Sequence, residues 1–371
     1  MNKIGIITIP DYNNYGNRLQ NYAVKEYFCK KGYDAITLEM NDSAFKKYKA
    51  RKYKLLLKKC GLTVGVFFFE AITGGFSKAR RELYFEKFTK KYLNVRYLPE
   101  YSEEIIQKLN EEFDFFVLGS DQIWHPFVND TPNLYFARFT NPNKKIYFAP
   151  SFGVKELPVD YAGIVKKELC TAKCLSVRET EGAEIIRTLT GKDVEVLVDP
   201  TLMLSSGDWS KIEQCPNDLK NKKYILCYFL GELSPEYKTQ IEIAKKKYNA
   251  DVYYIADPKN NIGYVNGPSE FLYSIHHAQM VLTDSFHAAV FSIVFHKPFN
   301  VFSRLNSDYK NAGLDSRVDT LLSKLGIENH KFKFEDGLCY DADYVFADAV
   351  IKEEIQKTER FIQASIDNAN I

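Results

Sequence analysis

Strand-like and helix-like segments alternate along most of this chain, and this alternation restricts the possible folds more than any other feature. Short apolar runs rich in Ile, Val and Phe precede longer segments with helical periodicity. Such alternation is typical of parallel sheets, because parallel strands need crossover connections that are usually helices. The strands expected in the first half are Lys3–Ile9, Ala35–Glu39, Phe113–Leu118, Lys145–Phe148, Cys174–Val177 and Glu195–Val198.

Helical periodicity fills most of the intervals between these strands. The expected helices are Arg18–Lys31, Lys78–Tyr92, Glu103–Leu109, Val159–Leu169 and Glu179–Leu189. Residues 42–101 are basic and aromatic and show no clear strand, so we interpret them as a helical insertion into the first domain.

Turn-forming residues after Asp199-Pro200-Thr201 mark the expected boundary between two domains. We predict an N-terminal α/β domain over 1–205, a second over 206–345 and a C-terminal helix over 346–371 that packs back across both. The second domain repeats the alternation in strands Tyr224–Phe229, Asp251–Ile255, Met280–Thr283 and Phe299–Phe302 and helices Glu236–Lys247, Glu270–Ala278 and Phe286–Phe295. Two Rossmann-like domains with parallel sheets facing a central cleft give a GT-B-like architecture.

Composition excludes several classes of protein. The 371 residues carry 50 basic and 48 acidic side chains, and a net charge of +2 argues against a nucleic-acid-binding protein. Seven scattered cysteines do not form a disulfide pattern, and Cys170 and Cys174 lack the further ligands of a zinc site. The chain has no dinucleotide-binding GxGxxG motif and no signal peptide. We therefore expect a reduced, cytoplasmic protein without a cofactor.

The most apolar internal segment, Leu62–Ile72, is too short to cross a bilayer, which takes about 20 apolar residues. Lysines on its N-terminal side would allow a helix that lies on a membrane surface, and peripheral membrane association stays possible on this basis. We favour the alternative, a partly buried helix with a solvated basic face.

The segment Met280–Ser292 is an apolar strand followed by a sharp turn and a helix, with His287 in the first helical turn. Ligands of open α/β sheets bind at the carboxyl ends of strands, and the unpaired N–H groups of a helix start favour an anion. Asp284 is placed to orient the imidazole or to raise its pKa. The alternative is a structural histidine that packs or caps the helix.

Polar residues follow other predicted strands and are candidates for a sugar-binding cleft. They offer hydrogen bonds and, at Trp124, a flat apolar ring, although capped helix starts and a core tryptophan would explain the same pattern. The candidate residues for the cleft or a sugar are Asn14, Gly16, Asn17, Ser120, Asp121, Gln122, Trp124, Glu270 and Asp284.

Three arginines also follow predicted strands. Arg178 offers a planar fork for a carboxylate or phosphate, although an ordinary surface pair with Glu179 is the alternative. Arg304 and Arg317 follow a later strand, and such a cluster of cations suits a doubly anionic ligand.

Five short segments in sequence order resemble the polysaccharide pyruvyl transferase family: Asn14-Tyr15-Gly16-Asn17, Gly119-Ser120-Asp121-Gln122-Ile123-Trp124, Ser176-Val177-Arg178-Glu179, Val198-Asp199-Pro200-Thr201 and Thr283-Asp284-Ser285-Phe286-His287. The resemblance extends from the first strand to about Leu325. It implies a GT-B-like enzyme that moves a pyruvyl group from phosphoenolpyruvate onto two sugar hydroxyls, forming a cyclic ketal.

The resemblance also implies roles for individual residues. His287 matches the catalytic histidine and Arg178 a donor-binding arginine, whereas Ser285 stands where members often carry another donor-binding arginine. Arg304 or Arg317 is expected to supply that charge. An imidazole with a pKa near 6.5 would transfer the proton that activates the donor.

The acceptor implied by the resemblance is a lipid-linked or nucleotide-linked sugar in surface polysaccharide synthesis. Two other functions stay open from the residues. One is a GT-B glycosyltransferase in which Glu270 holds a hydroxyl of a nucleotide-sugar donor. The other is a glycan-binding protein without turnover.

Overall fold

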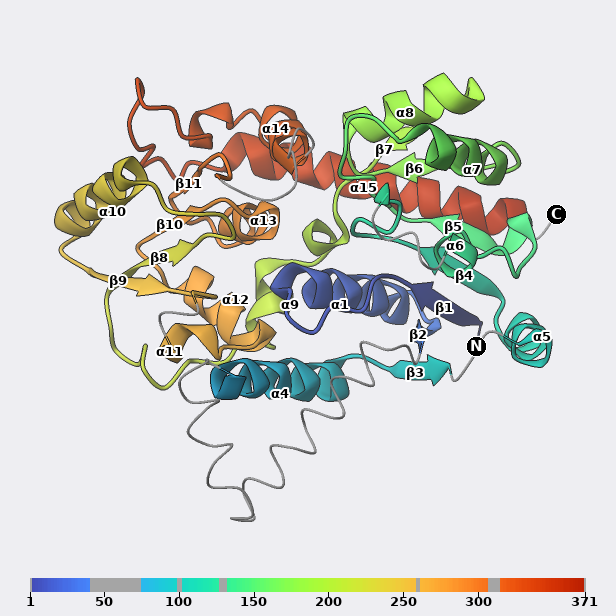
Figure 1. Cartoon of the computed structure of the whole chain (residues 1–371), viewed down its shortest axis with the longest axis horizontal. Coiled ribbons are helices and arrows are strands. Elements are labelled where there is room, and N and C mark those ends of the chain that lie inside the picture. The colour runs from blue at the N-terminus through green and yellow to red at the C-terminus, as the bar shows by residue number, and fades with distance from the viewer. Residues whose placement is uncertain are drawn as a thin grey trace, which may run out of the picture.

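The computed structural model describes residues 2–40, 75–98, 102–126, 132–257, 261–305 and 314–369. Two parallel sheets form the two halves of the molecule, with helices packed around them (Figure 1). The first sheet has the order β3-β2-β1-β4-β5 and contains β1 (Lys3–Ile7), β2 (Asp34–Met40), β3 (Val95–Leu98), β4 (Phe115–Leu118) and β5 (Lys145–Tyr147). The second has the order β11-β10-β8-β9 and contains β8 (Tyr224–Tyr228), β9 (Asp251–Tyr254), β10 (Met280–Thr283) and β11 (Phe299–Val301).

All pairings within these two sheets are parallel, which confirms the predicted α/β class and the GT-B-like pair of Rossmann-like sheets. The helices and short strands of the first half are α1 (Tyr15–Lys30), α4 (Gly75–Tyr92), α5 (Glu103–Glu112), α6 (Pro132–Tyr135), α7 (Val159–Leu169), β6 (Ser176–Val177), α8 (Thr180–Thr190) and β7 (Glu195–Val196). Those of the second half are α9 (Ser206–Ser210), α10 (Pro235–Tyr248), α11 (Asn261–Tyr264), α12 (Pro268–His276), α13 (Phe286–Val294), α14 (Leu314–Leu325) and α15 (Val345–Ala369). The 3-10 turns are η2 (Pro142–Lys144), η3 (Pro200–Met203) and η4 (Glu328–His330).

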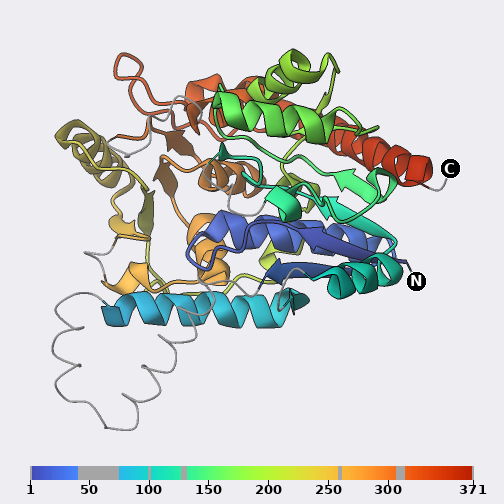
Figure 2. The same cartoon turned by 45° about the vertical axis from the view of Figure 1, so that its right-hand side comes forward.

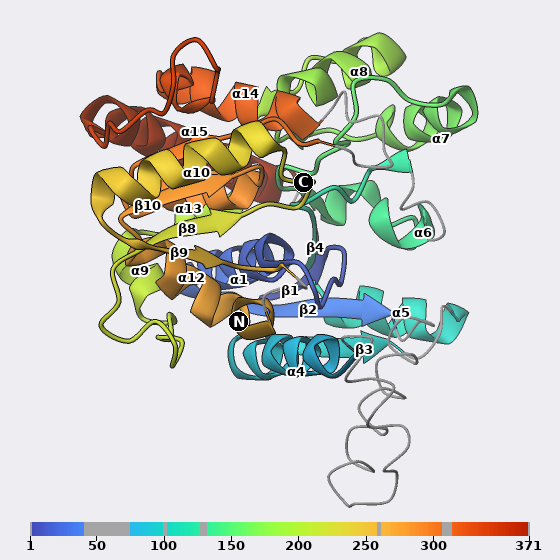
Figure 3. The same cartoon turned by 60° about the vertical axis from the view of Figure 1, so that its left-hand side comes forward.

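Helix α1 lies between the two sheets and joins their cores (Figure 3). Its Tyr15 and Leu19 belong to the same buried apolar cluster as Phe271 of α12 and Phe291 of α13. The rings of Tyr15 and Phe271 stack at a centroid distance of 4.5 Å. Because these residues are buried together, α1 fixes the position of one sheet relative to the other.

The predicted helical insertion at 42–101 needs correction, because β3 lies within it. β3 is an edge strand that pairs in parallel with β2, and the preceding α4 packs against α11 and α12 of the other half (Figure 2). A four-residue run interrupted by Arg96 gives little strand signal, and only its pairing with β2 makes it regular. The segment Leu62–Ile72 and its neighbouring lysines lie outside the described residues.

Helix α15 runs along both halves of the molecule (Figure 1). It contacts α14 in the second half and β5, η2 and η3 in the first. The predicted boundary at 205/206 falls at the start of α9, where Ser205 is the N-cap, and it stays a prediction. None of the described helices is long and apolar enough to cross a membrane.

Candidate active site

A shared carboxylate, Asp199, organises a buried cluster between the halves. Its Oδ2 lies 2.6 Å from Nη1 of Arg178 and 3.8 Å from Nε2 of His287. Its Oδ1 accepts hydrogen bonds from the N–H and hydroxyl of Thr201, which hold the start of η3. Arg178 follows β6 and His287 follows β10, so strand ends from both halves meet here, as expected for an α/β ligand site.

The first turn of α1 closes the cluster from the side of the first sheet. A Cβ added to Gly16 would lie 2.0 Å from Nδ1 of His287, so only glycine allows this approach. Asn14 is the N-cap of α1, and Nδ2 of Asn17 donates to Oδ2 of Asp121 at 2.8 Å. Asn14 therefore caps the helix, and Asn17 binds Asp121 instead.

The loop after β4 places its candidate residues in different surroundings. Ser120 donates a 3.0 Å hydrogen bond to the carbonyl of Ala149, and its hydroxyl lies 3.4 Å from Oδ2 of Asp199. Nε2 of Gln122 is buried and has no hydrogen-bond partner among the described residues. Trp124 is fully buried and stacks on Phe136, so its ring fills the core and presents no face to a sugar.

Asp284 does not orient His287, contrary to the expectation from its place in the sequence. Its carboxylate accepts hydrogen bonds from the backbone N–H groups of Leu230 and Gly231, both at 2.7 Å. The same carboxylate lies 3.3 Å from Nε of Arg304. Both side chains therefore hold the loop after β8, and Asp199 is the carboxylate next to the imidazole.

Two guanidinium groups lie near the ring of Phe286, the residue before His287. The guanidinium carbons of Arg178 and Arg317 lie 4.8 and 5.6 Å from the ring centroid. Three buried guanidinium nitrogens have no hydrogen-bond partner in the described part of the chain: Nε and Nη2 of Arg178 and Nε of Arg317. The same is true of Nε2 of His287. Buried N–H groups of guanidinium ions are nearly always paired in proteins, so the nitrogens of Arg178 and Arg317 are available to bind an anion.

Ser285 occupies the N-cap position of α13 but does not cap the helix with its side chain. Its N–H donates to the hydroxyl of Thr283 at 3.0 Å, and its own side chain makes no capping bond. It is buried at 5% exposure, within the turn that leads to His287. A small buried side chain therefore stands at the position where family members often carry an arginine.

Burial lowers the pKa of His287 to about 4, with Arg178 and Arg317 lowering it and Asp199 and Asp121 raising it. Burial alone would raise the pKa of Asp199, but the charge of Arg178, the imidazole of His287 and the hydrogen bonds from Thr201 together outweigh it, and the pKa falls to about 2. The pKa of Arg317 falls to about 10 because of burial and the charge of Arg178. At neutral pH the imidazole is therefore uncharged and both arginines are charged, which differs from the histidine pKa near 6.5 expected from the sequence.

Asp199 was not among the predicted site residues, although its segment belongs to the resemblance. The signal was a carboxylate directly after the apolar run Leu197-Val198, where the first half ends. The alternative of a surface pair between Arg178 and Glu179 is wrong, because Glu179 is buried and its Oε1 accepts from the hydroxyl of Ser151 and the N–H of Phe152. These partners come from distant segments, which sequence spacing does not reveal.

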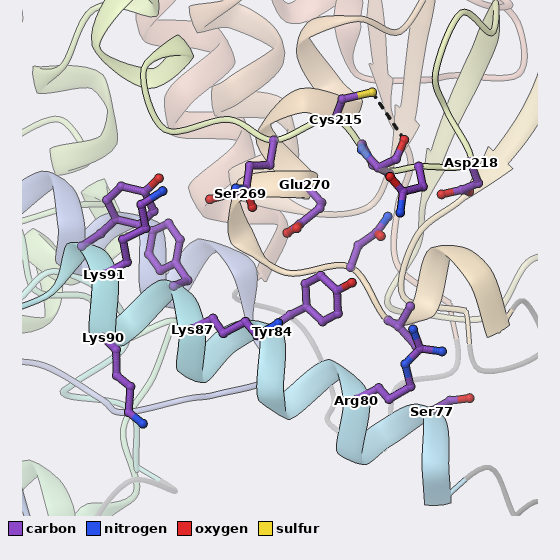
Figure 4. Close-up of a pocket in the computed structure, with 17 residues that line it drawn as sticks. Ser77, Arg80, Tyr84, Lys87, Lys90, Lys91, Cys215, Asp218, Ser269 and Glu270 are labelled. Carbon is purple, nitrogen blue, oxygen red and sulfur yellow. Dashed lines mark hydrogen bonds between the residues drawn. The ribbon is translucent and has the colours of Figure 1, made fainter.

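A cavity of about 1160 Å³ lies apart from this cluster, in a groove between α4, α12 and residues 214–218 (Figure 4). One face of α4 lines it with Arg80, Tyr84, Lys87 and Lys91. Glu270 lies on the opposite wall, where its Oε2 accepts from the N–H of Gly267 at 3.1 Å. We name this cavity the α4–α12 groove.

The first turn of α1 separates the cluster from the groove. Gly16 contacts His287 on one side, while the hydroxyl of Tyr15 donates to the carbonyl of Asn266, a residue of the groove, at 3.1 Å. The predicted cleft residues therefore divide into two groups. Gly16, Asn17, Ser120 and Asp121 lie at the cluster, and Glu270 lies in the groove.

Comparison with solved structures finds matches of low identity along most of the chain. HepE (Alr3699) of Anabaena with UDP and glucose is 9% identical with a TM-score of 0.41, and the match covers 98% of each chain. The UDP-GlcNAc 2-epimerase of Neisseria meningitidis bound to UDP-GlcNAc is 11% identical with a TM-score of 0.45, covering 96% of this chain and 100% of the other. The strand order and the parallel pairing of the two sheets define the fold of this chain.

A family model gives a more specific match. No curated protein matches this sequence. The model described as polysaccharide pyruvyl transferase matches residues 14–306, which include Gly16, Arg178, Asp199 and His287. The match covers well over half of the chain, and the chain belongs to the polysaccharide pyruvyl transferase family.

Proposed function

We propose that this protein transfers the pyruvyl group of phosphoenolpyruvate to two hydroxyls of a sugar, forming a cyclic ketal and releasing phosphate. The observation that carries the proposal is the set of buried, unpaired nitrogens on Arg178, Arg317 and His287 around one carboxylate. Phosphoenolpyruvate carries a carboxylate and a phosphate, and two guanidinium groups suit such a pair of anions.

The reaction needs one proton at the methylene carbon of the donor. Protonation makes that carbon a methyl group and leaves the central carbon open to attack by the first sugar hydroxyl. The second hydroxyl then attacks the same carbon as the C–O bond to phosphate breaks. Two hydroxyl protons are lost, one replacing the proton given to the methylene carbon and one leaving with phosphate, so atoms and charge balance.

His287 is the group we assign to the proton transfer. Its pKa of about 4 leaves it neutral at pH 7 without a donor. A bound trianionic or dianionic donor would place negative charge beside the imidazole and raise this pKa, because an opposite charge stabilises the protonated ring. Donor binding is thus expected to be accompanied by proton uptake, and Asp199 would hold the protonated ring in place.

The sugar hydroxyls of the acceptor must meet the donor at His287, so we place the remaining part of the acceptor, with its phosphates, against the α4–α12 groove. Its wall combines the cations Arg80 and Lys87, the ring of Tyr84 and the carboxylate of Glu270 (Figure 4). Aromatic faces and carboxylates are common sugar contacts, and the cations suit the phosphates of a lipid-linked or nucleotide-linked sugar. This supports a role in surface polysaccharide synthesis.

The test is a phosphate-release assay with phosphoenolpyruvate and a panel of lipid-linked and nucleotide-linked sugars. We expect phosphate release together with a mass gain on the sugar that corresponds to the pyruvyl ketal. His287→Gln should lower the rate about 10²- to 10⁴-fold, the range for a general acid or base. His296→Gln is the matched control, because His296 is exposed and pairs with Asp348 away from the cluster.

Two results would contradict the proposal. One is full activity of His287→Gln, which would remove the proton-transfer role. The other is thermal stabilisation by a nucleotide sugar but not by phosphoenolpyruvate, since ligands stabilise the folded state that binds them. The second result would favour a nucleotide-sugar-dependent glycosyltransferase.

A further inference from the structure

Three side chains that commonly bind metals converge at the C-terminal end of α12, outside the His287 cluster. Nδ1 of His276 lies 2.9 Å from Oε2 of Glu213, and Nε2 of His277 lies 3.2 Å from Oε1 of the same carboxylate. One ligand-type atom from each residue lies within 4.8 Å of the other two. The centroids of the two imidazole rings are 4.7 Å apart.

These distances match the spacing of donors around a small transition-metal ion. Tetrahedral zinc with ligand bonds of about 2.0–2.2 Å has donors about 3.3–3.5 Å apart. The two nitrogen–oxygen separations, 2.9 and 3.2 Å, are shorter than this and involve different oxygens of Glu213. A small side-chain rotation that replaces the direct hydrogen bonds would therefore admit the ion.

We propose that Glu213, His276 and His277 form a zinc-binding site. Two imidazoles and one carboxylate form a donor set that suits zinc, whereas magnesium and calcium prefer oxygen ligands. The side chains of His276 and His277 are 34% and 43% exposed, so water can reach the fourth coordination position. The site is independent of the proposed pyruvyl transfer.

The surrounding contacts hold the two imidazoles in place before a metal binds. The ring of His276 stacks on Phe295 at 4.3 Å, and the ring of His277 stacks on Tyr273 at 4.0 Å. Side chains fixed in this way lose little conformational entropy when they bind an ion. We therefore expect these two histidines to bind zinc more tightly than two freely rotating surface histidines would.

The site joins two segments that also form the α4–α12 groove. Glu213 lies in the connection between α9 and β8, and the histidines lie at the C-terminal end of α12. The next residue, Gln214, donates its N–H to the carbonyl of Ser269 at 3.0 Å, and both line the groove. Zinc would therefore fasten this connection to α12 and stiffen one wall of the groove.

The experiment is isothermal titration of zinc into the untagged full-length protein after removal of metals with a chelator. We expect one zinc ion per chain with a dissociation constant in the micromolar range or tighter. His277→Gln and Glu213→Gln should each weaken binding at least tenfold, and zinc should raise the melting temperature of these two variants less than that of the wild type.

His296→Gln is the matched control. His296 also pairs with a carboxylate, Asp348, at 3.0 Å, but no third ligand-type group joins that pair in the described part of the chain. Its zinc affinity should equal that of the wild type. Circular dichroism and melting without zinc check that each variant folds.

Three outcomes would overturn the proposal. The first is the absence of binding by the wild type at tens of micromolar zinc. The second is wild-type affinity in His277→Gln. The third is a sulfur-to-metal charge-transfer band on cobalt substitution, which would assign the ion to a thiolate such as the exposed Cys215.

Discussion

The His287 cluster and the α4–α12 groove differ in how their charged groups are surrounded. In the cluster, Arg178 and Asp199 are buried at 4% and 2% exposure and pair directly. In the groove, Arg80 and Lys87 are exposed along one face of α4. Burial makes the first set sensitive to any lost partner, whereas solvent screens the second set.

The two regions also arise from different parts of the fold. The cluster needs strand ends from both halves and the close approach of α1, so many distant contacts fix it. The cations of the groove come from one helix at the spacing of a single face, 80, 87 and 91. We infer that the cluster determines the chemistry and that the groove adjusts affinity, and substitutions in each should separate these effects.

The largest effect on stability is expected for Asp199→Asn. The variant leaves the guanidinium of Arg178 buried without its charged partner, and breaking a buried ion pair in this way costs about 3–5 kcal/mol. Urea denaturation followed by circular dichroism measures the loss. A loss below about 1 kcal/mol would show that water reaches Arg178 and that the contrast with the groove is false.

The next effect concerns the pH dependence of stability. The pKa of His287 is about 4 in the folded protein, against an ordinary value near 6.5, so the unfolded chain binds a proton that the folded protein does not. The free energy of unfolding therefore falls by about 1.4 kcal/mol for each unit as the pH drops from 6.5 towards 4. His287→Gln should lose this part of the slope in urea titrations.

The low pKa of Asp199 acts in a different pH range. Its carboxylate stabilises the folded protein until the pH falls below its ordinary value of 3.8 towards 2. Asp199 therefore adds nothing to the slope of stability against pH between pH 6.5 and 4. Equal slopes in the wild type and His287→Gln would mean that the imidazole is solvated.

Gly16→Ala should have an intermediate effect. The new methyl group would lie 2.0 Å from Nδ1 of His287 and would displace the imidazole or α1, at a cost of about 1–3 kcal/mol for overpacking. Turnover in the phosphate-release assay should fall at least tenfold. Gly163→Ala in α7 is the control, since nothing lies within 4 Å of its added Cβ, and it should gain about 0.5–1 kcal/mol.

Much of the fold could be predicted from the sequence because its signals are local. Apolar runs such as Phe115–Leu118 and the helix at Val159–Leu169 carry their own periodicity and end markers, and the structure contains both. The edge strand Val95–Leu98 was missed because its regularity comes from pairing with β2. The local sequence pattern therefore predicts helices and strands better than it predicts which strands pair with each other.

The candidate site could be predicted only in part. Strand ends indicated Arg178 and His287, and the structure brings these two residues to one carboxylate. The partner of His287 was assigned to Asp284 because the two are neighbours in sequence, but Asp284 binds the N–H groups after β8. The correct partner, Asp199, lies 88 positions earlier, and only the packing of α13 against η3 brings it close.

The smallest effect is expected in the groove, for Lys87→Gln. Because the side chain of Lys87 is exposed, its substitution should change the free energy of unfolding by less than about 0.5 kcal/mol. If Lys87 contacts a phosphate of the acceptor, losing that charge-assisted hydrogen bond should raise the acceptor KM about tenfold. The donor KM and kcat should stay unchanged, because α1 separates the groove from His287.

Lys78→Gln on the same helix removes the same charge outside the groove and should change none of these constants. A fall in kcat for Lys87→Gln would instead mean that the groove and the buried cluster work as one site.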